Sequence, residues 1–197
     1  IQRGERIALI GHNGAGKSTL FLLLSGLQPS WSGEVYLHGQ LIHPQERVAL
    51  RQQVALVLQN SNYQLFTPSV EDEIAFGLKN MGLREEALHK RLEELLTRYN
   101  LAELRHKPPH ELSEGQKKWV ALVSVLATDP EVLILDEPTA ALDALYTERV
   151  LDLLEQLHLA GKTIIISTHD MELASRFGTS KSKLCAGPMA TSRWGCL

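Results

Sequence analysis

The sequence has 197 residues, with 20 Lys and Arg against 23 Asp and Glu, which gives a formal net charge of −3. Hydrophobic residues make up 44% and charged residues 22%, an ordinary globular composition that excludes disordered, collagen-like and disulfide-scaffold chains. The negative balance argues against a nucleic-acid binder driven by bulk positive charge, and the apolar stretches at 20–24 and 119–127 are far shorter than the about 20 residues of a membrane span.

The first residues lead directly into a strand. Ile1 is not an initiator methionine and no signal-peptide pattern follows, so we expect the chain to begin inside a larger protein. Residues 6–10 form a short apolar run that stops at glycine, which predicts a buried parallel strand. An apolar helix is predicted over residues 19–27, and alternating residues around a turn at Gly39 predict a β-hairpin over 33–41.

The remaining pattern alternates strands with helices, which predicts an α/β fold with a mostly parallel sheet. The exception is residues 71–128, where apolar residues recur at helical spacing, and we expect a helical subdomain there. We predict further strands over 54–58, 132–135 and 163–167, and further helices within 70–104 and over 113–127 and 147–159. The predicted core then comprises residues 1–70 and 129–177, followed by a tail at 178–197.

A glycine-rich segment follows the first strand and fits G-x-x-x-x-G-K-[ST], the phosphate-binding loop. Glycines let successive backbone N–H groups point inward as an anion nest, and the next helix adds its positive N-terminal end. Lys17 would reach the β- and γ-phosphates, and the Ser18 hydroxyl would ligate Mg²⁺. The alternative is a glycine turn with a chance lysine. The predicted ATP-binding residues are Gly11, His12, Asn13, Gly14, Ala15, Gly16, Lys17, Ser18 and Thr19.

Two acids end the strand predicted at 132–135. Asp136 would hold Mg²⁺ through water opposite Ser18. Glu137 is the better candidate for polarising the attacking water. The alternative reading is a solvated acidic turn before Pro138, which the phosphate loop disfavours. Together the motifs predict a P-loop nucleotide hydrolase core that uses ATP and Mg²⁺.

The segment between these motifs resembles the signature of the ATP-binding cassette (ABC) family, usually Leu-Ser-Gly-Gly-Gln. The order of the other motifs also matches, with Gln59 at the glutamine-loop position, Asp143 in the D-loop and His169 at the switch position. The resemblance covers about residues 4–176. The signature residues are Leu112, Ser113, Glu114, Gly115 and Gln116.

The resemblance implies a head-to-tail dimer, either a homodimer or a pair of ABC ATPase subunits. ATP bound at Lys17 of one subunit would be covered by the signature of the other, where Ser113 and Gly115 supply donors to the γ-phosphate. His169 would contact the γ-phosphate or the attacking water within its own subunit. Gln59 would sense Mg²⁺ and relay its state to a transmembrane transporter subunit.

Three departures from the family pattern matter. Glu114 replaces the first signature glycine, a position that tolerates variation. Trp119 stands where the signature helix commonly carries arginine, which puts intersubunit polar contacts there in doubt. The N-terminal strands of the family, including the aromatic residue that stacks on adenine, would lie before Ile1.

Residues 59–77 resemble the importer branch that serves cobalt, nickel and energy-coupling-factor vitamin systems. Read only as structure, the same stretch is a polar loop leading into a helix capped by Ser69. We therefore expect the ATPase subunit of such an importer, held peripherally at the cytoplasmic face of the cell membrane. Two alternatives are a truncated, non-hydrolysing remnant of such a subunit and a soluble ABC ATPase outside transport.

The last twenty residues follow neither a strand nor a helix period. They contain both cysteines, Cys185 and Cys196, without a Cys-x-x-Cys spacing, which favours a reducing compartment. The family resemblance stops at about Phe177, as an out-of-frame or truncated reading would produce, or a divergent regulatory tail. We expect this segment to be mobile and without function.

Overall fold

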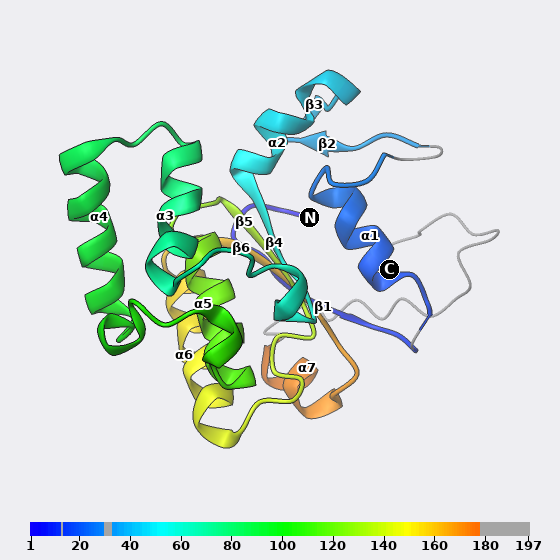
Figure 1. Cartoon of the computed structure of the whole chain (residues 1–197). Helices are drawn as coiled ribbons and strands as arrows, with labels where there is room; N and C mark the ends of the chain where they lie inside the picture. The colour runs from blue at the N-terminus through cyan, green and yellow to red at the C-terminus, as the bar shows by residue number, and fades with distance from the viewer. Residues whose placement is uncertain (13, 30–32, 178–197) are drawn as a thin grey trace. The chain divides into compact units, whose positions relative to one another are not determined.

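The structure is a computed structural model that describes residues 1–12, 14–29 and 33–177 (Figure 1). The predicted tail and Asn13 of the predicted phosphate loop lie outside the described residues. Contacts divide the chain into two compact units. Among the described residues, the first unit comprises those within Ile1–Leu56, Pro130–Pro138 and 153–177, and the second comprises Val57–Asp129 and Thr139–Asp152.

The main sheet has four strands in the order β1, β6, β5, β4 among the described residues. β6 runs parallel to both β1 and β5, which confirms the predicted α/β fold with a parallel sheet. Parallel strands bring their carboxyl ends to one edge, where ligands bind in open α/β sheets. The strands span Arg6–Ile10 (β1), Val54–Val57 (β4), Val132–Asp136 (β5) and Thr163–Thr168 (β6).

The core of the first unit joins the sheet to two helices, α1 (Lys17–Leu24) and α2 (Arg47–Gln53). An antiparallel hairpin of β2 (Tyr36–Leu37) and β3 (Gln40–Leu41) confirms the predicted turn at Gly39. An apolar cluster packs the strands against these helices, and its burial holds β1, β5 and β6 in place. The cluster consists of Ile7, Leu9, Phe21, Leu50, Val54, Ile134 and Ile165.

The second unit is helical. α3 (Val70–Asn80) contacts both α4 (Glu85–Arg98) and α5 (Glu114–Leu126), and the three helices lie side by side in Figure 1. Gly82, with φ +87°, separates α3 from α4, because a glycine tolerates the left-handed turn that ends a helix. Single 3₁₀ turns of this unit lie at Ser61–Tyr63, Ala102–Leu104 and Pro109–Glu111, and the first unit has one at Pro44–Glu46.

Several element ends differ from the prediction. α1 stops at Leu24 instead of residue 27, because Gly26 adopts φ +70° and the Leu27 N–H donates back to Leu22 O at 2.9 Å. This is the common glycine-terminated helix end. Two helices were not predicted, α2 and the short α7 (Met171–Phe177).

The last long helix, α6 (Ala144–Leu159), starts three residues before the predicted position. Asp143 Oδ1 accepts a hydrogen bond from Tyr146 N at 2.8 Å, and such a cap satisfies one of the free N–H groups of the first turn. The compact units also divide the chain at other places than the predicted domain boundaries, which stay a prediction.

Candidate nucleotide site

The predicted phosphate loop leads from β1 into α1. Gly14 and Gly16 have φ of +82° and +89°, a left-handed geometry that side chains disfavour. α1 begins at Lys17 without a side-chain cap and without an acidic residue in its first turn. Its first N–H groups are therefore left for an external acceptor, which a phosphate supplies.

Lys17 lies over the same loop. Its ammonium donates hydrogen bonds to Gly11 O at 2.7 Å and to His12 O at 3.2 Å. These two carbonyls hold the Lys17 ammonium beside the glycine turn from which α1 begins. A cation and a row of free N–H groups together form a polyanion site.

Two side chains that could ligate a metal ion through oxygen meet next to this loop. Ser18 Oγ donates a hydrogen bond to Asp136 Oδ2 at 2.5 Å, joining the first turn of α1 to the carboxyl end of β5. Asp136 is buried, whereas Ser18 is exposed. A hydroxyl and a carboxylate are the hard oxygen ligands that Mg²⁺ prefers, so these two residues fit that ion.

Glu137 follows Asp136 and has an unusual backbone, with φ +49°. Its side chain is 8% exposed and its Oε1 lies 2.9 Å from Nδ1 of His169, which is 70% exposed. The hydrogen bond to Glu137 raises the pKa of His169 above its ordinary 6.5, the negative charge of Glu137 adds to the effect, and the charge of Lys17 opposes it. The structure thus pairs the two residues predicted to be catalytic.

Ser167 was not predicted as a site residue. Its hydroxyl donates to Asp136 Oδ1 and accepts a hydrogen bond from Glu137 N at 2.9 Å. The sequence carried one signal for it, a hydroxyl residue directly after the three isoleucines of β6. That signal is weak without the register of β5 against β6, which places Asp136 beside Ser167.

The predicted signature segment lies in the second unit, at the start of α5. Ser113 caps this helix: Gln116 N donates to Ser113 Oγ at 3.2 Å and Ser113 N donates to Gln116 Oε1 at 2.9 Å. Leu112 is buried, and Glu114 pairs with Lys117 at 2.8 Å. The segment therefore starts a helix with a capping box, and its part in a partner's ATP site stays a prediction.

Trp119 is part of the interior of the second unit. It is 7% exposed, its Nε1 donates to Tyr99 O at 3.0 Å, and the two rings meet edge to face with centroids 6.0 Å apart. The residue at this position is thus a satisfied core side chain. Any polar contact that an arginine would make there is replaced by packing within the chain.

Gln59 and Asp143 also belong to the second unit. Gln59 is exposed after β4, and its predicted contact with Mg²⁺ stays a prediction. The segment that contains it is tied to α5 by Gln64, whose Oε1 accepts from Leu58 N at 3.1 Å and whose Nε2 donates to Ala121 O at 3.1 Å. Asp143 caps α6 as described above.

An aromatic pair lies just beyond this segment. Phe66 and Phe76 are 67% and 44% exposed and meet edge to face with centroids 5.0 Å apart. Buried Glu73 fixes the loop that carries Phe66, because its Oε2 accepts from Phe66 N, Thr67 N and Thr67 Oγ1 at 3.1, 3.1 and 2.8 Å. The predicted Ser69 cap of α3 is confirmed, with Asp72 N donating to Ser69 Oγ at 3.1 Å.

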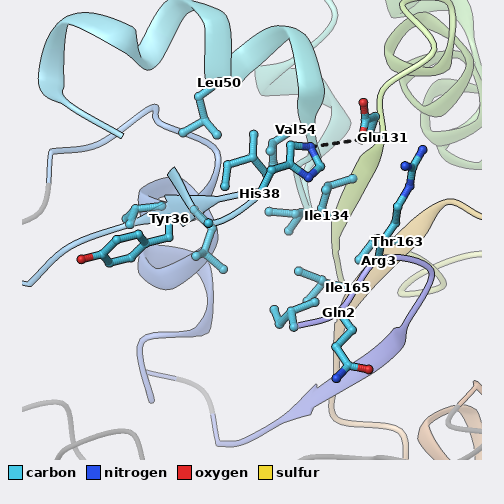
Figure 2. A pocket seen from close by; sticks show the side chains of 16 residues that line it. Gln2, Arg3, Tyr36, His38, Leu50, Val54, Glu131, Ile134, Thr163 and Ile165 are labelled. Carbon is cyan, nitrogen blue, oxygen red and sulfur yellow. Dashed lines mark ion pairs between the residues drawn. The ribbon is translucent and has the colours of Figure 1, made fainter. Parts of the chain in front are cut away.

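The first unit also contains an apolar cavity of about 360 Å³ (Figure 2). Ile134 and Ile165 line its interior, and His38 Nε2 lies 3.2 Å from Glu131 Oε2 at its rim. None of its lining residues is a predicted site residue, so we assign it no part in nucleotide chemistry. Across the described residues, every helix is too short or too polar to cross a membrane.

The fold and the loop geometry define a P-loop nucleotide-binding protein. Residues 1–140 match the ABC transporter family. The chain therefore belongs to the ABC transporter family, as the sequence resemblance predicted.

Two archaeal relatives are both energy-coupling factor transporter ATP-binding proteins EcfA. The one from Methanocaldococcus jannaschii is 46% identical over 175 residues, which are 88% of this chain and 63% of that protein. The one from Methanothermobacter thermautotrophicus is 41% identical over 191 residues, which are 96% of this chain and 61% of that protein. The chain thus spans less than two thirds of the length of either relative.

Two solved structures share the fold. CbiO1 from Clostridium perfringens, described as part of the ABC transporter complex cbiONQ, superposes with a TM-score of 0.80 at 39% identity, over 94% of this chain and 74% of that one. The ATP-binding cassette MJ0796, in a dimeric post-hydrolysis state bound to ADP and Pi, superposes with a TM-score of 0.82 at 28% identity, over 94% and 82%.

Proposed function

We propose that this chain is the ATP-binding and ATP-hydrolysing part of an importer ATPase of the energy-coupling factor class. One observation carries the hydrolytic part of this proposal: Asp136 and Glu137, adjacent at the end of β5, contact Ser18 and His169 respectively. A carboxylate against the phosphate-loop serine and a second carboxylate held by a histidine are suited to Mg²⁺-dependent phosphoryl transfer to water.

Each residue has a role in this reaction. Lys17 and the α1 N-terminus would bind the β- and γ-phosphates, and Ser18 and Asp136, together with Gln59, would hold Mg²⁺. The bound ion would neutralise charge on the phosphate oxygens. Glu137 would take a proton from the attacking water while the water oxygen bonds to the γ-phosphorus. The bond between the γ-phosphorus and the β,γ-bridging oxygen would break, and ADP would leave with that electron pair. His169 would orient the Glu137 carboxylate.

The partners are part of the same proposal. We propose a dimer in which the signature of one subunit, starting at Leu112, covers ATP in the other; the related cassette MJ0796 is dimeric in its ADP- and Pi-bound structure. The exposed pair Phe66 and Phe76 would dock a transmembrane subunit, because exposed aromatic patches mark interaction sites. The protein would then lie peripherally at the cytoplasmic face of the membrane.

The transported substrate would be a metal ion, cobalt or nickel, or a vitamin. The support is the resemblance of residues 59–77 to that importer branch, together with the similarity to the energy-coupling factor protein EcfA and to CbiO1. The substrate passes through the membrane subunit, so residues of this chain do not select it.

ATP hydrolysis measured with and without a candidate membrane subunit tests the proposal. Glu137→Gln should keep ATP binding and nearly abolish turnover, whereas Lys17→Ala should weaken both, because the lysine binds ground state and transition state alike. Lys90→Ala, an exposed change on α4, is the control and should leave both unchanged. Near-normal hydrolysis by Glu137→Gln would show that this carboxylate is not the base.

A further inference from the structure

Ser167 lies beside both acidic residues of the proposed site, Asp136 and Glu137. It is the fifth residue of β6, its exposed fraction is 0%, and its register partner on β5 is Asp136. The hydroxyl is therefore sealed from water, and its hydrogen bonds are made within the protein. Which groups it bonds decides what it does.

Both hydrogen-bonding capacities of this hydroxyl point to the neighbouring strand. The proton is donated to Asp136 Oδ1, and the oxygen accepts from Glu137 N at 2.9 Å. Glu137 N also donates to Ser167 O at 3.2 Å. One side chain thus bonds two consecutive residues of the proposed site.

The bond to Asp136 fixes which oxygen is presented to the phosphate loop. With Oδ1 held by Ser167, Oδ2 faces Ser18 Oγ at 2.5 Å. A group that hydrogen-bonds a metal ligand orients that ligand, and losing it commonly weakens metal affinity by about 10–100-fold. Without the Ser167 hydroxyl, Oδ1 would keep a buried charge without this donor, and the carboxylate plane would be free to turn.

The bond to Glu137 holds a strained backbone. Glu137 is not glycine, yet its φ is +49°, a region that persists only where the surroundings enforce it. The Glu137 N–H donates to both the hydroxyl and the carbonyl oxygen of Ser167. This backbone sends the Glu137 side chain toward His169, two residues after Ser167, at 2.9 Å.

We propose that Ser167 is a positioning residue that sets the Asp136 carboxylate for Mg²⁺ and the Glu137 backbone for the attacking water. The inference rests on the function proposed above and adds to it a residue that makes no contact with nucleotide. A merely structural serine would serve stability alone. Ser25 is such a residue in the same unit: it is 1% exposed and its hydroxyl donates to the local carbonyl Leu22 O at 3.2 Å.

The test measures binding of a fluorescent ATP analogue as a function of Mg²⁺ concentration, in the full-length protein. For Ser167→Ala we expect the half-saturating Mg²⁺ concentration to rise about tenfold or more, with little change in analogue binding in EDTA. Turnover at saturating MgATP should fall more than the Michaelis constant changes. Ser25→Ala should lower the unfolding temperature without moving the Mg²⁺ midpoint.

Two further measurements cover the case in which Ser167→Ala fails to fold. Ser167→Cys keeps nearly the same volume with a weaker donor, and it should shift the Mg²⁺ midpoint in the same direction. In the unaltered protein, the Glu137 amide should exchange slowly with deuterium, because it is bonded to Ser167. Fast exchange of that amide, or a Mg²⁺ midpoint that stays at the wild-type value in the folded Ser167 variants, would overturn the inference. Absence of Mg²⁺-dependent nucleotide binding in the wild type would instead overturn the proposed function.

Discussion

The ring of Tyr146 lies against the α-carbon of Gly115, so that a β-carbon on Gly115 would sit 2.6 Å from Tyr146 Cδ2 and 2.9 Å from its Cγ. Both residues belong to the second unit. The signature glycine is therefore required by packing within this chain, whatever a partner's nucleotide also requires. Arg149 lies over the same ring, 5.3 Å from its centroid.

Replacing Gly115 by alanine tests this contact. The added methyl group would force the Tyr146 ring to move, and overpacking of this kind costs about 1–3 kcal/mol, although alanine is otherwise the better helix former by about 1 kcal/mol. We expect a net loss in the free energy of unfolding measured with urea. In a Tyr146→Ala background the same substitution should cost much less, because the clash is gone. An equal cost in both backgrounds would contradict the contact.

The sequence was sufficient where the signal is local. The strand at Arg6–Ile10 and the loop after it follow from apolar residues and glycines that are neighbours in the chain. The end of α1 was missed because the apolar pattern continues to residue 27. The helix ends earlier because Gly26 adopts a left-handed φ, which terminates a helix whatever the hydrophobicity of the next residue. The Ser69 cap was found because its partner, Asp72, is three residues away.

Long-range relationships account for what the sequence did not predict. Ser167 reaches Asp136 across 31 residues through strand register, which no local pattern encodes. Trp119 departs from the family pattern, and only its contact with Tyr99, twenty residues earlier, explains it. Family resemblance supplied the predicted roles of Gln59 and Asp143, for which spacing alone gave no reason.

The His169–Glu137 pair makes a prediction about pH. The hydrogen bond to Glu137 raises the pKa of His169 above 6.5, so in the folded protein the ring should stay protonated to higher pH than a free histidine. The stability from the pair is then fully present below the ordinary pKa of histidine and is lost as pH rises through the raised pKa. An NMR titration of the His169 ring measures this directly.

Two variants should move that titration in opposite directions. Glu137→Gln removes the charge and the stronger acceptor, and should bring the pKa of His169 down toward its ordinary value. Lys17→Met removes the opposing positive charge and should raise the pKa further. If both variants titrate like the wild type, the pair does not form in solution.

Trp119 should tolerate phenylalanine better than the arginine that the family commonly carries. Trp119→Phe loses the hydrogen bond to Tyr99 O and leaves that buried carbonyl without this donor, which costs about 1–3 kcal/mol. Trp119→Arg buries a charge where an aromatic ring packs, and an uncompensated buried charge costs about 3–5 kcal/mol. Urea unfolding should rank wild type, phenylalanine and arginine in that order. A variant with arginine as stable as the wild type would show that this position is open to solvent.

Gln64 makes two hydrogen bonds, one to Leu58 N in the segment after β4 and one to Ala121 O in α5, and we expect the bond to Leu58 N to matter more for stability. In Gln64→Leu, Ala121 O keeps the hydrogen bond from Ser124 Oγ at 3.0 Å, whereas Leu58 N loses its acceptor. A buried amide left without an acceptor costs about 1–3 kcal/mol; Leu58 is half-buried, so we expect a loss at the lower end of that range in the free energy of unfolding. Hydrogen exchange should accelerate at the Leu58 amide while the amides of α5 keep their protection.

The control for this change is Asn62→Ala, an exposed substitution in the same segment. It removes a side chain of comparable polarity without touching either bond of Gln64, so the exchange rate at Leu58 should stay at its wild-type value. Equal protection of the Leu58 amide in Gln64→Leu and Asn62→Ala would mean that backbone packing, and not the Gln64 amide, fixes the segment that carries Gln59. Faster exchange in Gln64→Leu alone would identify the Gln64 amide as the group that fixes Leu58 in this segment.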